Sequence, residues 1–361
     1  MMARFSDVLT IINGKNQSKV VDPVGQYPIY GSGGIMGYAN DYICEAETVI
    51  IGRKGNINKP IFVETPFWNV DTAFGLWANR KILLPKYLYY FCQYFDFERL
   101  NTTVTIPSLT KANLLDIEID LPSIDDQNTI VAQLDKAEKI ISLRKQQLSK
   151  LDELVKSRFI EIFGDVINND RNWPMATMGD VAEIKIGPFG TLLHKEDYIV
   201  GGHALVNPSH IVDGKIAVDI SLTISDEKYE ELSAYHLKID DIVLGRRGEM
   251  GRCAVVREEG LLCGTGSLII RPNDKLKPYF LQTIISNPTY KKIIEDKAVG
   301  VTMMNLNVPI VESLRVPMLP IELQNDFISF TEQVDKSKYE IQKSLEKLET
   351  LKKALMQKYF G

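Results

Sequence analysis

The sequence predicts an α+β fold in which two tandem, homologous, strand-rich domains are joined by two long antiparallel coiled-coil helices about a pseudo-two-fold axis. The first observation is a long helical pattern between Gln127 and Gly164, in which apolar residues recur at spacings of three and four. Such spacing is typical of a coiled-coil helix. The second observation is that the pattern returns 197 positions later, at residues 324–361. A chain that repeats itself in this way is built from two equivalent units.

The two helical stretches match residue by residue in places, since Leu148 and Phe163 return as Leu345 and Phe360. Neither stretch can bury its apolar seam alone, so we expect the two helices to pack on one another. A run of about 38 residues rises ~1.5 Å per residue, which makes a rod of roughly 57 Å. The residues predicted to form the seam are Leu134, Ile141, Leu148, Leu151, Val334, Ile341, Leu345 and Leu348.

A matching entrance precedes each helix. A Leu-Pro step ends the preceding strand or loop, because proline restricts the residue before it to extended conformations. A Gln-Asn pair follows at Gln127 in the first repeat and at Gln324 in the second. We call the two domains heads. The predicted segments are a first head at 1–122, a central helix at 123–164, a linker at 165–174, a second head at 175–320 and a C-terminal helix at 321–361.

Short sequences recur in the two heads as well. VIIGRKG at residues 49–55 and IVLGRRG at residues 242–248 both indicate a short buried strand that ends in a glycine-flanked basic turn. The connecting loops differ in sequence and length, so we expect one scaffold with two different surfaces. Residues 85–100 are expected to form a helix whose aromatic stripe belongs to the core rather than to a base-stacking surface.

The composition is that of a globular protein without a membrane segment. The 361 residues are 45% hydrophobic, and the first seven residues lead into no apolar signal core. No apolar run reaches the roughly 18 residues that a membrane helix needs. We therefore expect a cytoplasmic chain. The four cysteines share no metal-binding spacing with each other or with the four histidines, so they are interpreted as buried free thiols and no metal site is expected.

Charge and motifs restrict the function further. A net charge of −5 argues against a general polyanion binder, but it is compatible with a DNA reader whose cations lie on one face. No complete GxGxxG or GxxxxGK[ST] motif is present, so no dinucleotide or nucleotide cofactor is expected. The four scattered histidines support no nucleophile-base arrangement. We therefore expect a non-catalytic chain that needs no cofactor.

The glycine-flanked basic turns are the best candidates for contacts with DNA. Arginine can fork onto guanine O6 and N7, asparagine can pair with adenine N6 and N7, and lysine generally meets phosphate. Adjacent glycines allow the backbone to approach closely. The alternative is an ordinary hairpin with exposed cations. The candidates are Arg53, Lys54, Asn56 and Asn58 in the first head, and Arg246, Arg247 and Arg252 in the second.

Other segments are weaker candidates for the same role. The glycine-rich stretch at residues 31–37 can approach a phosphate or simply form a tight bend. The segments at 103–111 and 301–307 enter the two helices from equivalent places, and their small polar side chains can face either DNA or the helices. The residues concerned, together with a lysine near the start of the second head, are Tyr30, Gly31, Ser32, Gly33, Thr105, Ser108, Lys185, Asn305 and Asn307.

Two related heads on an antiparallel helix pair suggest how such a chain works. Duplex DNA has two-fold axes perpendicular to its own axis, so pseudo-symmetric heads can meet one face of it about one turn apart, at ~34–36 Å. Because their loops differ, the heads would read two different half-sites. The main alternative is a protein-interaction scaffold whose heads bind proteins or glycans, which the acidic balance favours. A stand-alone enzyme is a third interpretation, against which the missing motifs weigh.

The order head, helix, head, helix resembles the specificity subunit of Type I restriction-modification enzymes over essentially the whole chain. The stretches that carry the resemblance are PIYGSGGIMGYAND, VIIGRKGNI and the helix sequences that begin LPSIDDQNTIVAQLDK and LPIELQNDFISFTEQVD. The resemblance implies two target recognition domains, each of which reads one half of a split, asymmetric site in double-stranded DNA. It also implies that the helices bind two methyltransferase subunits, that restriction subunits join this core, and that methylation and ATP-driven cleavage belong to these partners.

Apolar residues outside the strict seam add apolar area near the end of each helix, and we expect these ends, or the junctions of head and helix, to dock the methyltransferase subunits. We expect loss of partner binding when Phe163 or Phe360 is replaced by aspartate. The six candidates are Leu154, Phe159, Phe163, Leu351, Met356 and Phe360.

Overall fold

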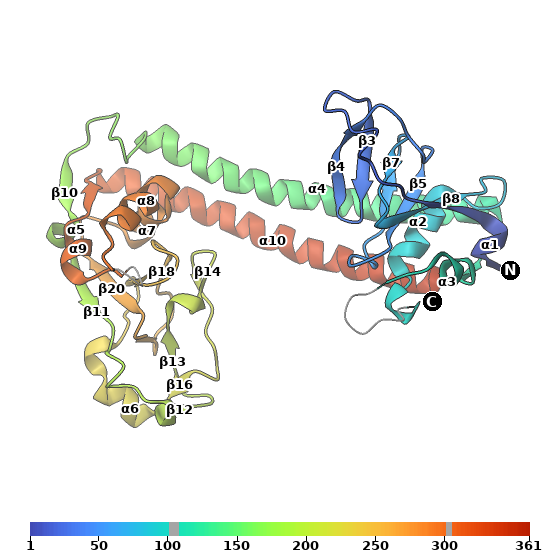
Figure 1. The fold of residues 1–361 in the computed structure, drawn as a ribbon. Coiled ribbons are helices and arrows are strands. Elements are labelled where there is room, and N and C mark those ends of the chain that lie inside the picture. The colour runs from blue at the N-terminus through green and yellow to red at the C-terminus, as the bar shows by residue number, and fades with distance from the viewer. Residues whose placement is uncertain (101–107, 301–304) are drawn as a thin grey trace. The chain divides into compact units, whose positions relative to one another are not determined.

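Figure 1 shows the ribbon of the computed structural model, which describes residues 1–100, 108–300 and 305–361. The chain divides into two compact units, each of which holds one head and a part of each long helix. The helices are therefore built into the units instead of forming separate modules. Unit 1 comprises Met1–Leu148 with Glu340–Gly361, and unit 2 comprises Ser149–Tyr339.

The head of unit 1 is built on a four-stranded antiparallel sheet in the order β2-β8-β5-β6. Helix α2 packs on this sheet, and a second sheet in the order β4-β3-β7 contacts it through β7. Strands β1 and β9 pair as a short antiparallel ribbon. The bounds are β1 Met2–Arg4, α1 Phe5–Val8, β2 Leu9–Asn13, β3 Tyr27–Gly31, β4 Gly34–Ala39, β5 Thr48–Gly52, β6 Ile61–Val63, β7 Trp68–Asn69, β8 Ala73–Ala78, α2 Pro85–Tyr94, α3 Lys111–Leu115 and β9 Glu118–Asp120.

The head of unit 2 repeats this plan, which confirms the predicted internal repeat. Its central antiparallel sheet has the order β11-β20-β17-β18, α7 packs on it, and the β10-β21 ribbon corresponds to β1-β9. Its second sheet, β12-β16-β13-β19, differs in strand order from that of unit 1. The bounds are β10 Met175–Thr177, α5 Met178–Val181, β11 Ala182–Ile186, β12 Tyr198–Ile199, β13 His203–Val206, β14 Ile211–Val212, β15 Lys215–Ile216, β16 Thr223–Ile224, α6 Asp226–Glu231, β17 Ile242–Gly245, β18 Cys253–Val255, β19 Leu262–Cys263, β20 Ser267–Pro272, α7 Pro278–Ser286, α8 Pro288–Lys297, α9 Val308–Glu312 and β21 Arg315–Pro317.

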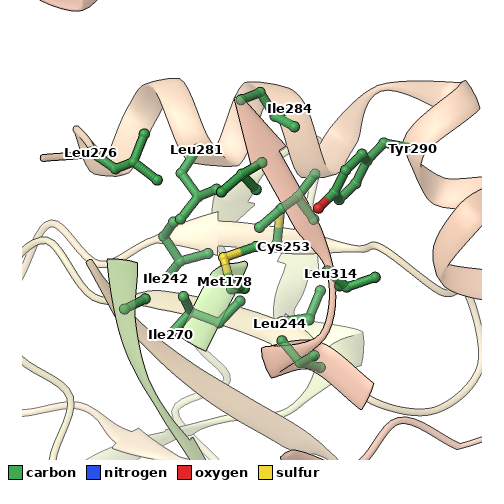
Figure 2. Close-up of a cluster of buried hydrophobic side chains, with 14 of the residues drawn as sticks. Met178, Ile242, Leu244, Cys253, Ile270, Leu276, Leu281, Ile284, Tyr290 and Leu314 are labelled. Carbon is green, nitrogen blue, oxygen red and sulfur yellow. The ribbon is translucent and has the colours of Figure 1, made fainter. Parts of the chain in front are cut away.

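Figure 2 shows the apolar core of unit 2, where α7 covers one face of the central sheet. Leu281 and Ile284 of α7 meet Ile242 and Leu244 of β17 and Ile270 of β20, and all five side chains are fully buried. Burial of one such side chain stabilises the fold by roughly 1.5–3 kcal/mol. Val243 and Ile269, the residues next to these positions, are buried in a separate cluster, so successive side chains of β17 and β20 face opposite sides of the sheet and α7 covers one of them.

Two long helices contribute to both units. They are α4, Ile124–Phe163, and α10, Ile321–Phe360. The eight side chains predicted for the seam are all buried or half-buried, and Leu134, Val334 and Leu345 are buried most completely. In the part of the chain that the structure describes, no helix is long and apolar enough to cross a membrane.

Within unit 1 the two helices run antiparallel. Tyr359 of α10 donates a hydrogen bond of 2.6 Å to Gln133 of α4. Lys145, further along α4, forms an ion pair of 3.0 Å with Glu349, which lies earlier in α10. The end of α10 packs on the head, because Phe360 contacts the aromatic side chains of α2.

The helices also run antiparallel within unit 2, which holds the end of α4 and the beginning of α10. Asp152 of α4 pairs with Lys338 of α10, and Phe159, further along α4, contacts Phe327 near the start of α10. Here it is the end of α4 that packs on the head. The ring of Phe159 lies 6.0 Å from that of Phe280 in α7. Each head is thus held by the beginning of one long helix and the end of the other.

One segment differs in detail from the sequence expectation, and the predicted linker has contacts of its own. The helix expected over residues 85–100 ends at Tyr94 and is followed by a separate 3-10 turn at Phe97–Leu100, although its aromatic stripe is buried as expected. The segment at 165–174 forms a cap on α4. There Gly164 adopts a left-handed φ of 72° and Arg171 donates to two carbonyl groups of the last helical turn.

Candidate nucleic-acid interface

In unit 1 the basic turn (residues 52–59) leaves the buried strand β5 and is fastened to the head through its backbone. The amide of Arg53 donates to the carbonyl of Thr72 over 2.8 Å, and the carbonyl of Arg53 accepts from the amide of Leu109 over 2.9 Å. Gly55 adopts a φ of 75°, a conformation that favours glycine. The backbone of the turn is therefore fixed to the head and Ile57 is buried in its core, while the side chains of Arg53, Lys54 and Asn56 are exposed.

The basic turn of unit 2 (residues 245–252) leaves β17 and has the same anchors. The amide of Arg246 donates to the carbonyl of Gly266 over 3.0 Å, and its carbonyl accepts from the amide of Leu306 over 3.0 Å. Gly248, 193 positions after its counterpart, has a φ of 76°. The two heads thus share the backbone of the turn, although they share little of its sequence beyond the glycines and cations.

The turns also bring together residues that are distant in the sequence. In unit 1, Lys54 forms an isolated antiparallel bridge with Ser108. In unit 2, the guanidinium Nε of Arg246 donates a hydrogen bond of 2.9 Å to Oδ1 of Asn305, the counterpart of Ser108. The candidates on the turn and on the segment that enters α3 or α9 therefore form one site in each head. Thr105 lies outside the described residues.

The side chains of the two turns differ in exposure. Arg53, Lys54 and Asn56 are exposed in unit 1, and Arg53 also lies over the ring of Phe74 at 5.8 Å. In unit 2, Arg247 is exposed. The first turn can therefore offer three polar side chains to a ligand and the second turn offers one exposed arginine beside a buried one.

Arg246 is the most unusual charge in either site, because only 7% of its surface is exposed. Within the described residues it forms no ion pair, and Asn305 is its side-chain partner. Burial lowers the pKa of the Arg246 guanidinium, and the adjacent charge of Arg247 lowers it further. A buried cation without a carboxylate is costly. An incoming phosphate would offset this cost.

A glycine-rich hairpin joins the site in unit 1. Its tip, between β3 and β4, lies beside the basic turn, since a Cβ added at Gly33 would lie 4.0 Å from Nδ2 of Asn56 and one added at Gly52 would lie 3.0 Å from Cβ of Ser32. Tyr30 itself is half-buried and its ring packs edge-on against Phe67. Burial raises the pKa of Tyr30, with a smaller effect from Tyr38. Tyr30 and Gly31 therefore support the hairpin, and its tip is the part that lies beside the basic turn.

Four residues predicted to contact DNA also have partners within the protein, and their contact with DNA stays a prediction. Asn58 donates to Asp96 and accepts from the amide of Phe97, so it fastens the turn to the 3-10 helix. Asn307 accepts from the amide of Ile310 as the N-cap of α9. The remaining two are ion-paired side chains, Arg252 with Glu249 and Lys185 with Glu183.

The residues predicted to dock partners also divide into two groups. Phe159, Phe163 and Met356 are buried within their own units, and the ring of Phe360 lies 5.1 Å from that of Tyr87. These four side chains pack at the junctions of head and helix within their own units, Phe360 being half-buried, and their role in partner docking stays a prediction. Two equivalent leucines remain available on the helix surface, with exposures of 47% for Leu154 and 52% for Leu351.

Comparison with known proteins identifies the family. The sequence model of the family described as the Type I restriction modification DNA specificity domain matches residues 1–153 and 170–353. The chain belongs to this family. The two matched segments agree with the two tandem heads and the long helix that follows each of them.

Relatives of this specificity family cover different shares of the chain. A putative type I restriction enzyme specificity subunit, MjaX, of Methanocaldococcus jannaschii is 28% identical over 52% of this chain and 45% of that protein. The MjaVIII specificity subunit of the same organism is 20% identical over 98% of this chain and 90% of the relative. The EcoBI specificity subunit of Escherichia coli is 21% identical over 87% of this chain and 73% of the relative.

A solved structure shows the same fold. The crystal structure of a Type I restriction-modification S subunit from M. genitalium matches with a TM-score of 0.64 and 16% identity, over 100% of this chain and 96% of that chain. A structure described as the basis of complex assembly and conformational transition of the type I restriction-modification system matches with a TM-score of 0.60 and 15% identity, over 99% and 97% of the two chains.

The sequence analysis missed two features of the site. One is the burial of Arg246, and the other is the pair of leucine amides that hold the two turns. The second feature had a signal in the sequence, because Leu109 and Leu306 are separated by 197 positions, as the helices are. The burial of Arg246 had no signal in the sequence, since the neighbouring residue, Arg247, is also an arginine and is exposed.

Proposed function

We propose that this chain is the sequence-specific DNA-recognition subunit of a Type I restriction-modification complex, in which each head reads one half of a bipartite, asymmetric target. The observation that carries the proposal is the equivalence of the two basic turns. Each turn is anchored through the same backbone groups, at Arg53 in one head and Arg246 in the other, and each has an exposed arginine, Arg53 or Arg247. Two copies of one DNA-binding device in one chain fit a target with two halves.

Differences between the turns support different half-sites. Unit 1 offers Arg53, Lys54 and Asn56 next to the hairpin tip, which can combine base-edge and phosphate contacts. Unit 2 offers Arg247 for a base edge and Arg246 for a phosphate. The second sheet of each head also differs in strand order. Neighbouring loops therefore present different shapes to the groove, which makes the two halves of the target different.

We further propose that the long helices set the gap between the half-sites and dock two methyltransferase subunits. The equivalent positions of Leu154 and Leu351 support two equivalent docking sites, because each is an exposed leucine on one of the long helices. Restriction subunits would join this core in the cytoplasm. Base methylation, ATP hydrolysis and cleavage would take place in these partners, and this chain would contribute recognition.

Selection from a pool of random duplexes tests the proposal. We expect the complex of this chain with its methyltransferase subunits to enrich a split motif with two different halves and a fixed gap. A double variant, Arg53→Ala with Arg247→Ala, should enrich a motif with relaxed base preference in both halves. A matched double variant of two exposed, ion-paired arginines, Arg80→Ala with Arg257→Ala, should enrich the wild-type motif. A well-formed wild-type complex that enriches no motif would refute the proposed function.

A further inference from the structure

A buried glutamine joins the head of unit 1 to the start of its long helix. Gln127, in the first turn of α4, has no exposed surface. Its Oε1 accepts a hydrogen bond of 2.8 Å from the amide of Leu84, and its Nε2 donates to the carbonyls of Ile82 at 2.9 Å and Pro122 at 3.0 Å. One side chain thus connects the loop before α2, the end of the β9 segment and the helix.

In unit 2 a second buried glutamine joins the head to the start of its long helix through equivalent hydrogen bonds. Gln324 of α10 is also fully buried. Its Oε1 accepts from the amide of Lys277 at 2.9 Å, and its Nε2 donates to the carbonyls of Lys275 at 3.1 Å and Leu319 at 2.8 Å. The six bonds correspond one to one between the units. They persist although the heads around them differ in loop lengths and in their second sheets.

The residue type follows from the bonds that the joint requires. An amide side chain supplies one acceptor and two donor hydrogens, and all three are used here. Glutamate lacks the donors, methionine lacks both functions, and asparagine is one methylene shorter. Leu84 and Lys277 are the N-caps of α2 and α7, and the proline that follows each of them fixes the first helical turn. The amide therefore fixes the helix that covers the sheet relative to the long helix.

We propose that Gln127 and Gln324 are positioning residues that fix the angle between each head and its long helix. They thereby restrict the complex to sites with one fixed number of base pairs between the two half-sites. This inference rests on the proposed function. A change of one base pair in the gap moves a half-site by about 3.4 Å and rotates it by about 35°. A head whose attachment can tilt would tolerate such a change, whereas a head held by three hydrogen bonds on a buried amide would not.

The test is a map of methylated sites for the reconstituted complex with its methyltransferase subunits, because the gap can be read at every site. Gln324→Met keeps the length of the side chain and removes the three bonds. We expect both half-site sequences to persist, and methylation at sites whose gap is one base pair longer or shorter to rise on the order of tenfold, the scale of discrimination that one mismatched base pair carries.

A core variant in the same head provides the matched control. Ile269→Val removes a methylene from a fully enclosed position on β20, away from the joint, and should lower the Tm of the complex while leaving the gap strict. Gln324→Glu is the second variant, because it keeps the acceptor and the length; the same broadening of the gap is expected from it. Gln127→Met should act in the same way through the other head.

Two outcomes would overturn the inference. If the glutamine variants lower the Tm as the control does but keep the wild-type gap, the joint has only a structural role. If the wild-type complex itself shows no split motif, the proposed function fails and the inference fails with it. The first outcome leaves the proposed function intact, so the two failures are distinguishable.

Discussion

The backbone amide of Leu306 donates a hydrogen bond of 3.0 Å to the carbonyl oxygen of Arg246. Leu109 and Arg53 make the equivalent bond in the other head at 2.9 Å. Both leucine side chains are buried in the apolar cores. The backbone at which each basic turn begins is therefore fixed by the core. Exposed side chains can change with the target while the turn that presents them keeps its shape.

Replacement of the buried arginine separates its two possible roles. Arg246→Met removes a buried charge that has no carboxylate partner within the described residues, so we expect the Tm to stay within a few degrees of wild type. If this charge meets a phosphate, affinity for DNA falls about equally for all sequences and the salt slope decreases by about 1. Binding titrations at several salt concentrations measure both. A large loss of Tm with unchanged DNA affinity would show that Arg246 serves only the fold.

The cap of α9 predicts a structural effect without a change of specificity. Asn307→Ala removes the acceptor for the amide of Ile310, so we expect a loss of about 0.5–2 kcal/mol in unfolding free energy. Thr110→Ala, at the equivalent cap of α3, should cost a similar amount. Urea unfolding measures the loss, and the methylated motif should be unchanged. A relaxed base preference at one position would instead restore Asn307 as a DNA contact.

Two residues on α4 distinguish packing from partner docking. Phe163 is fully buried against Phe280 and Phe327, so Phe163→Ala should lower stability by about 3–5 kcal/mol. Leu154→Asp, at an exposed position, should change stability by about 0.5 kcal/mol or less, yet weaken copurification of the methyltransferase subunits. Full copurification with Leu154→Asp together with Leu351→Asp would exclude these leucines from the docking surface.

The four buried cysteines predict how the fold responds to alkaline pH. Burial raises the pKa of the Cys253 thiol to about 11 and that of Cys44 to about 12, and it raises the pKa of Cys92 and Cys263 as well. The folded thiols therefore stay protonated when unfolded thiols, with an ordinary pKa of 9.0, lose their protons. The thiols contribute stability in full below about pH 8, and this stability is lost as the pH rises through 9 toward the folded values.

Labelling with a thiol reagent tests the burial that raises the pKa values of these four cysteines. At pH 8 the native protein should react slowly at all four cysteines, and the urea-unfolded chain should react at all four within minutes. Rapid labelling of the native protein at any of these positions would contradict the burial that raises their pKa values.

The repeated parts of the fold were predictable from the sequence because the signals are local. The seam of α4 and α10 follows from apolar spacing, and the strand that precedes each basic turn follows from the run of buried residues before Gly52 and Gly245. The second sheets were not predictable, since their short strands pair across long loops. Nothing near β13, for example, indicates that it pairs in parallel with β19, more than 50 residues later.

The site was only partly predictable for a related reason. Residue type and turn chemistry pointed to Arg53 and Arg247, and the structure leaves both exposed. Asn58 and Asn307 have the same chemistry but are engaged by partners that only the tertiary fold supplies. Phe163 illustrates the same limit on a helix. An apolar residue outside the coiled-coil seam can face a partner protein or its own head, and the sequence pattern is the same in both cases.

Mapping of methylated adenines by single-molecule sequencing shows whether the two equivalent turns read the two halves of one target. The complex with its methyltransferase subunits would carry Arg53→Ala in one preparation and Arg247→Ala in the other. We predict that each substitution relaxes base preference in one half of the motif only, and that the two affect different halves. If both substitutions relax the same half, or if the motif is unchanged in both preparations, the two turns do not read separate halves of the target.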